Sequence, residues 1–144
     1  MMNVGDAFEN TQHLLSLDDP ILTLRTLQSM RVCDATESVT SIEKAGEGNM
    51  NLVMRVTTDR RSVIVKQARP WVEKYPSIAA PVERIHAETD FYDRVADFPG
   101  LARQMPLVIG SCSERQLLVL EDLGSANDHS ALYDRDAGGQ SRDA

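Results

Sequence analysis

The sequence predicts an α+β fold: a five-stranded antiparallel sheet with one long helix, preceded by an N-terminal helix. Short runs rich in β-branched residues are separated by turn residues, which is typical of strands joined in hairpins. Two other segments carry apolar residues at helical spacing. The expected order is helix, three strands, loop, long helix, two strands, which favours a single α+β lobe over a parallel α/β sheet.

The N-terminal helix and the first three strands have clear local signals. Asp19 can cap a helix whose first turn holds Pro20, and the apolar spacing that follows predicts an end near Met30. Three strands are expected at residues 38–44, 51–57 and 62–68. A glycine-rich turn joins the first two strands, and the polar residues 59–61 join the second and third.

The middle of the chain has fewer signals of regular structure. Three prolines within residues 69–81 predict an irregular loop through most of that segment. A long helix is expected from Pro81 until Pro99-Gly100, with one apolar face formed by Val82, Ile85, Thr89, Tyr92 and Ala96. The last two strands are expected at 107–109 and 116–120. The resulting organisation is an N-terminal helical extension (1–37), a lobe (38–124) and a polar, weakly ordered tail (125–144).

Composition excludes several classes of function. The formal net charge of −7 over 144 residues repels nucleic acid phosphates and anionic lipid, so neither is an expected partner. Cys33 and Cys112 stand apart from each other and from the three histidines, so we expect no metal site. The sequence has no signal peptide and no apolar run near ~18 residues, which favours the cytoplasm.

Two features of the first three strands suggest phosphate binding. Gly46 and Gly48 can form a tight turn whose N–H groups approach phosphate oxygens, although an ordinary hairpin turn explains them equally well. Lys66 lies in an apolar strand on the face of Ile64 and Ala68, where it could hold phosphates as a point charge. A solvated lysine at a sheet edge is the alternative.

The second half of the chain adds two further candidates. Glu88 lies on the inward face of the long helix, where a carboxylate needs a cationic partner, and we expect that partner to be Lys66. The apolar strand that ends at Glu121, Asp122 and Leu123 could pair its backbone groups with an adenine edge. Alone, each feature has a structural explanation: an exposed helix glutamate, or a strand ending in a turn.

Taken in order, these motifs resemble the amino-terminal lobe of protein-kinase-like small-molecule kinases. Residues 46–53 (GEGNMNLV) are similar to the G-D/E-G-N-x-N-L-V loop of methylthioribose kinases. Residues 64–70 (IVKQARP) are similar to their I-V-K-Q-A-x-P strand, and residues 84–88 (RIHAE) fit their R-x-x-x-E helix. Residues 120–123 (LEDL) resemble the hinge shared with aminoglycoside phosphotransferases and choline kinases. The likeness covers roughly residues 38–124.

The resemblance implies a role for each matching position. ATP, with Mg²⁺, would be the cofactor. Its triphosphate would lie under Gly46, Gly48 and Asn49, its α- and β-phosphates would contact Lys66 held by Glu88, and its adenine would pair with backbone groups of Glu121 and Leu123. In such kinases a larger helical lobe supplies the catalytic H-G-D segment and the metal ligands. The 144 residues contain no H-G-D, so we expect no catalytic and no metal-binding residue in this chain.

The resemblance leaves more than one function open. The first interpretation is an ATP-binding lobe of a kinase that phosphorylates a sugar or alcohol hydroxyl, truncated and inactive alone, with its small-molecule acceptor bound by the second lobe. The alternatives are a non-catalytic nucleotide-binding or interaction module and a fragment of an aminoglycoside or choline type of phosphotransferase. Tyr92, Val95, Leu120 and Leu123 are expected on the surface that the second lobe would cover, so self-association is possible.

Overall fold

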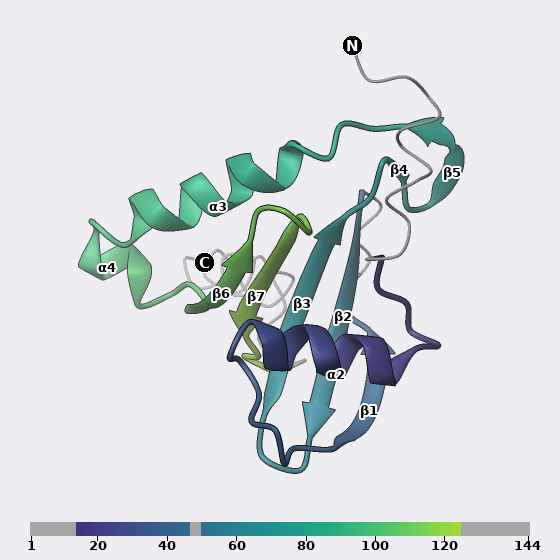
Figure 1. Cartoon of the computed structure of the whole chain (residues 1–144). Coiled ribbons are helices and arrows are strands. Elements are labelled where there is room, and N and C mark those ends of the chain that lie inside the picture. Colours follow the sequence, from purple (N-terminus) through teal and green to yellow (C-terminus); the bar gives the residue numbers. More distant parts are fainter. Residues whose placement is uncertain (1–13, 47–49, 125–144) are drawn as a thin grey trace, which may run out of the picture.

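The computed structural model describes residues 14–46 and 50–124, whose main feature is a five-stranded antiparallel sheet with a helix packed on each face (Figure 1). The strands are β1 (Val39–Lys44), β2 (Asn51–Thr58), β3 (Ser62–Ala68), β6 (Val108–Cys112) and β7 (Leu117–Glu121). Their order in the sheet is β1-β2-β3-β7-β6, with every neighbouring pair antiparallel. The predicted α+β class and five-stranded sheet are therefore confirmed.

Helix α2 (Pro20–Ser29) covers one face of this sheet, as Figure 1 shows. The side chain of Asp19 accepts a hydrogen bond from the N–H of Leu22 at 3.0 Å, which confirms the predicted cap. Leu27 and Val32 pack with alternate residues of the strands in the larger of two core clusters. The strand residues of that cluster are Leu52, Met54, Val56, Val63, Val65, Leu117 and Val119. The segment before β1 thus shares its core with the sheet.

Helix α3 (Arg84–Val95) packs on the other face, with Ile85 in a second core cluster that includes Ala68, Leu118 and Leu120. The helix begins three residues later than expected, because Val82 and Glu83 form a turn in which the carbonyl of Val82 accepts from the N–H of Ile85. It also ends earlier, at Val95. Pro99-Gly100, expected to end α3, instead starts the short helix α4 (Pro99–Ala102). Proline is tolerated in the first turn because the N–H that it lacks would have no partner within the helix.

The prediction of an irregular loop over residues 69–81 is wrong. Two short strands, β4 (Trp71–Val72) and β5 (Tyr75–Ala79), pair antiparallel in a separate two-stranded sheet. Pro76 is tolerated inside β5 because a strand with one neighbour has an edge at which no N–H is needed. Pro70 and Pro81 lie outside both strands, where the Pro70 carbonyl accepts from the N–H of Ala80 at 3.1 Å.

Three smaller expectations also change. Strands β6 and β7 each start one residue later than predicted, and Gln116 occupies the turn between them with φ of +50°. On α3, Ala96 is exposed, whereas Val95 is buried. The same packing buries Leu120, so neither Val95 nor Leu120 belongs to the exposed surface expected for them; Tyr92 is half-buried and Leu123 is 37% exposed.

A buried carboxylate, which the sequence analysis did not identify, joins the α2–β1 connection to the β2–β3 turn. Glu37 is 4% exposed and accepts from Thr58 Oγ1 at 2.8 Å and from the N–H of Asp34 at 2.9 Å. Arg61 adds an ion pair at 2.6 Å. Burial by itself would raise the pKa of Glu37, but the hydrogen bonds from Asp34, Thr58 and Arg61 outweigh it and lower the pKa to about 2.

We therefore expect acid to destabilise the fold through Glu37. Its carboxylate is charged in the folded state down to about pH 2 but protonates near 4.5 when unfolded, so its contribution is present above 4.5 and is lost as the pH falls towards 2. Glu37→Gln should remove on the order of 2 kcal/mol from the free energy of unfolding at neutral pH and flatten this acid limb. Urea unfolding between pH 2 and 7 measures both, and the exposed Glu114→Gln is the control. An unchanged acid limb in Glu37→Gln would contradict this role.

Candidate functional site

The central strand β3 presents Lys66 to the face that carries α3. Residues alternate along β3: Val63 and Val65 enter the α2 cluster, whereas Ile64 and Ala68 pack in the α3 cluster. Lys66 belongs to the α3 set. The strand is third of five in the sheet, so Lys66 is not the edge lysine of the alternative interpretation.

Lys66 and Glu88 meet across the interface between the sheet and α3. Lys66 Nζ donates to Glu88 Oε1 at 2.5 Å, and the side chains are 24% and 26% exposed. The predicted ion pair is thus confirmed. Because both partners keep contact with solvent, the ammonium is held in place by a carboxylate and remains open to a further anion.

The face around Lys66 is partly apolar. Val53 of β2 is the direct cross-strand partner of Lys66, and Ile64 precedes it on the same face of β3. Both side chains are half-buried. Neither residue was among the predicted site residues, although Ile64 was predicted to share the face of Lys66. A flat apolar ring system could pack here next to the ammonium.

The glycine-rich turn is described at its two ends. Gly46 has φ of +67°, a left-handed conformation that favours glycine, and the N–H of Ala45 donates to Val53 O at 2.9 Å to close the hairpin. Two predicted phosphate-binding residues, Gly48 and Asn49, lie outside the described residues. The structure therefore shows that Gly46 enters the turn next to a hydrogen bond between Ala45 and Val53 of β2. The phosphate contacts of this turn stay a prediction.

The end of β7 is held by Asp122, which the sequence analysis treated only as part of a motif. Its carboxylate accepts from Arg55 Nε at 2.8 Å, from Ser62 Oγ at 2.6 Å and from the N–H of Gly124 at 2.8 Å. Burial would raise the pKa of Asp122, but the hydrogen bonds from Arg55, Ser62 and Gly124 lower it. Asp122 therefore fixes the path of the chain between the two predicted adenine contacts.

Those two contacts are constrained differently. The N–H of Glu121 donates to Leu107 O at 2.8 Å, so Glu121 could serve an adenine edge only through its carbonyl oxygen. Leu123 lies just beyond the strand and is 37% exposed. The pairing of these residues with a base stays a prediction.

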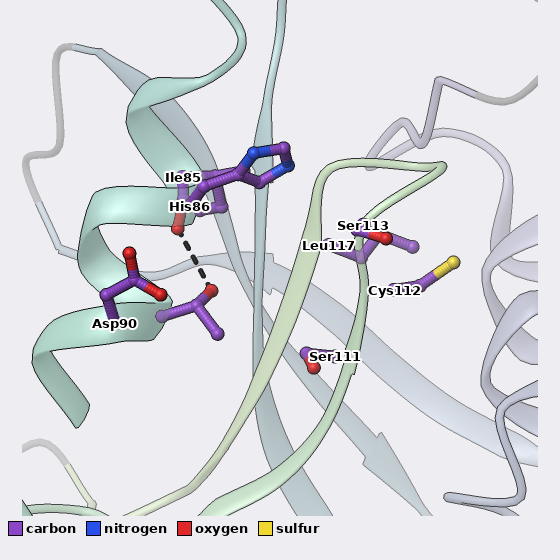
Figure 2. Close-up of a pocket in the computed structure, with 8 residues that line it drawn as sticks. Ile85, His86, Asp90, Ser111, Cys112, Ser113 and Leu117 are labelled. Atoms are coloured by element: carbon purple, nitrogen blue, oxygen red, sulfur yellow. Dashed lines mark hydrogen bonds between the residues drawn. The ribbon is translucent and has the colours of Figure 1, made fainter. Parts of the chain in front are cut away.

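A shallow cavity of about 280 Å³ lies on another side of α3. Figure 2 shows the side chains that line it. Ile85, His86 and Asp90 reach it from the helix, and Ser111, Cys112 and Ser113 from β6 and the turn that follows. It shares no lining residue with the Lys66–Glu88 pair. The face around the Lys66–Glu88 pair is open to solvent on one side, so it forms no enclosed cavity of its own. The ion pair remains the stronger candidate site, because it places a cation at a defined position.

Some other features bear on the chemistry of the chain. Within residues 14–46 and 50–124, no three His, Cys, Asp or Glu side chains converge in a way that could hold a metal ion. Cys33 and Cys112 are free thiols, and burial, followed by the charge of Glu37, raises the pKa of Cys33 to about 11. No helix in the described part of the chain is long and apolar enough to cross a membrane.

Comparisons with protein-family models and with curated proteins found no match for this chain.

We expect the Lys66–Glu88 pair to contribute little to stability. Both side chains are about a quarter exposed, and exposed ion pairs are typically worth about 0–1 kcal/mol. Glu88→Gln should therefore change the free energy of unfolding by less than about 1 kcal/mol, whereas Ile85→Ala on the same helix should cost about 2–5 kcal/mol. Urea unfolding of both variants tests this. A Glu88→Gln cost as large as that of Ile85→Ala would mean that the pair is a structural tie.

Proposed function

We propose that this chain is the ATP-binding lobe of a small-molecule kinase that transfers the γ-phosphoryl group of ATP to a sugar or alcohol hydroxyl. The observation that carries the proposal is the Lys66–Glu88 pair, 2.5 Å apart on the face between the sheet and α3. A lysine that is paired yet partly exposed retains its charge and a defined position. Those two properties are what phosphoryl transfer requires of a phosphate-binding lysine.

The surroundings of the pair support a nucleotide as the ligand. Val53 and Ile64 would pack against the base, while Gly46, with the left-handed φ of a tight turn, would let backbone N–H groups approach the phosphates. The end of β7, held by Asp122, would lie at the edge of the base. These groups fit ATP in charge and in polarity.

Catalysis requires groups that the described residues do not bring together. The kinases that the sequence resembles take their catalytic aspartate and their Mg²⁺ ligands from a second, helical lobe. Since no three His, Cys, Asp or Glu side chains of the described residues converge to hold a metal ion, the Mg²⁺ that accompanies ATP would be held by the nucleotide and by that lobe. This chain would therefore bind the nucleotide, and proton transfer would be left to the second lobe. The small-molecule acceptor would likewise contact the second lobe.

ATP binding tests the proposal directly. Lys66→Met should weaken ATP binding at least about tenfold, because a charge-assisted contact to phosphate is worth about 1.5–3 kcal/mol. Titration calorimetry with ATP, together with a melting curve to verify folding, measures this. Lys74 is an exposed lysine in the β4–β5 hairpin. Its replacement, Lys74→Met, removes one positive charge elsewhere on the chain and should bind ATP as tightly as the unmodified chain does. Equal affinity of Lys66→Met and Lys74→Met would refute the assignment.

Residues 1–144 alone should not transfer phosphate. Without an H-G-D aspartate to position the hydroxyl, a coupled assay with ATP, Mg²⁺ and methylthioribose or another alcohol should show no turnover above background. A rate near ~1 s⁻¹, the low end for kinases, would show that the catalytic groups are in this chain after all.

An apolar surface beside α3 is where we propose that the second lobe docks. The segment from Phe98 to Ile109 exposes five large hydrophobic side chains: Phe98, Leu101, Leu107, Val108 and Ile109. Leu107 lies next to the end of β7, because its carbonyl accepts from the N–H of Glu121. Large apolar side chains that stay exposed along one segment are candidates for burial against another domain.

The chain alone should therefore self-associate through this surface. Sedimentation velocity over a range of concentrations should show reversible association that Leu107→Gln reduces. Ile21→Gln is a matched control, since Leu107 and Ile21 are each 64% exposed but Ile21 lies on α2. A chain that stays monomeric at every concentration would count against a docking surface here and favour a self-sufficient module.

A further inference from the structure

Arg84, the first residue of α3, makes more hydrogen bonds than any role in the helix requires. Its Nε donates to Asn51 Oδ1 at 2.9 Å, and its Nη2 donates to Met50 O at 2.5 Å. Its Nη1 donates to Arg69 O at 3.0 Å and to Pro81 O at 2.5 Å. One side chain thus joins the start of β2, the end of β3 and the start of α3.

Helix stability does not explain a cation at this position. Positive charge in the first turn of a helix opposes the helix dipole. The ion pairs formed among the described residues do not include Arg84. Burial lowers its pKa, and only the more distant charge of Glu73 acts the other way. The half-buried guanidinium thus holds backbone and amide oxygens of other elements.

Arg84 and Glu88 are four residues apart, so they lie one above the other on the same side of α3. Arg84 ties the helix to Asn51, the first residue of β2, and to Met50 just before it, and Glu88 ties the helix to Lys66 of β3. Val53, two residues beyond Asn51, is the cross-strand partner of Lys66. The two contacts therefore connect one helix face to both strands that border the proposed phosphate site.

We propose that Arg84 is a positioning residue for the nucleotide: it fixes the start of β2 to α3, so that the phosphate-facing end of β2 and the Lys66–Glu88 pair keep one relative position. This proposal rests on the proposed function and extends it. Four N–H groups of Arg84 are already used in hydrogen bonds within the protein, so the side chain does not bind the nucleotide directly. It acts by holding Met50 and Asn51 against the start of α3.

The effect should be specific to the phosphates. Arg84→Met should raise the Kd for ATP about tenfold, because the contact of Lys66 with the phosphates weakens once the start of β2 and α3 lose their fixed relative position, and it should leave the Kd for adenosine unchanged. A general loss of structure would weaken both ligands together. The ratio of the two affinities, measured by titration calorimetry on folded protein, therefore separates positioning from damage to the fold. An equal loss for ATP and adenosine would overturn the proposal.

Two further variants sharpen the test. Arg84→Lys keeps the positive charge but cannot present a planar fork to several acceptors, so it should behave like Arg84→Met. If Arg84→Lys retains the affinity for ATP, charge alone matters and positioning is wrong. Arg94→Met removes an exposed arginine from the last turn of the same helix and should bind ATP like the unmodified chain.

A measurement without nucleotide separates this proposal from the proposed function. In Arg84→Met, amide hydrogen exchange should accelerate both at residues 50–54 and at residues 84–88, because one contact secures both segments. Arg94→Met should leave both unchanged. Acceleration at 84–88 with full protection at 50–54 would show that Arg84 does not couple them. If the unmodified chain fails to bind ATP, the proposed function falls, and the exchange experiment still decides whether the coupling exists.

Discussion

The alternation of side chains along β3 is the constraint on which the rest of the structure depends. Because β3 is the central strand, its residues must satisfy a helix on each face. Val63 and Val65 complete the core under α2, and Ile64 and Ala68 complete the smaller core under α3. Lys66 lies inside the sheet where the α3 face is incompletely covered, so its ammonium keeps contact with solvent while it pairs with Glu88.

Polar contacts hold the ends of the strands where apolar packing stops. Glu37 joins the β2–β3 turn to the segment after α2, and Asp122 joins the end of β7 to β2 and β3. Arg84 does the same at the opposite end of β2. Glu37 and Asp122 accept several hydrogen bonds, and Arg84 donates several. A charge that is partly or fully removed from water is tolerated when it is hydrogen-bonded in this way. The apolar residues hold the layers together, whereas these charges determine where the chain turns.

Local patterns predicted most elements because their signals are local. The Asp19 cap with Pro20 marked α2, and the β-branched runs marked β1, β2, β3 and β7 within one or two residues. The inward faces of Lys66 and Glu88 followed from periods of two and 3.6 residues, and their pairing followed from the cost of burying charge. The β4–β5 hairpin was missed because its prolines signal irregular structure, while the tolerance of an edge strand for proline depends on the finished fold.

Long-range partners were beyond the reach of pattern analysis. Nothing in the sequence around Glu37 shows that it meets Thr58 and Arg61, and the burial of Val95 and Leu120 depends on how closely α3 packs. Arg84 was visible as the first residue of the R-x-x-x-E motif. Its partners, Met50 and Asn51, lie more than thirty residues earlier, and only the folded chain brings them together.

The β4–β5 hairpin has a consequence for handling the protein. Its two strands pair only with each other, every residue of β5 is exposed, and Ala80 and Pro70 close its base with one hydrogen bond. Protruding segments of this kind are where proteases cut and where insertions are best tolerated. Limited digestion should therefore nick the chain within Tyr75–Ala79 before it reaches the sheet. An epitope or fluorophore inserted there would leave both core clusters intact, because neither cluster contains a residue of β4 or β5.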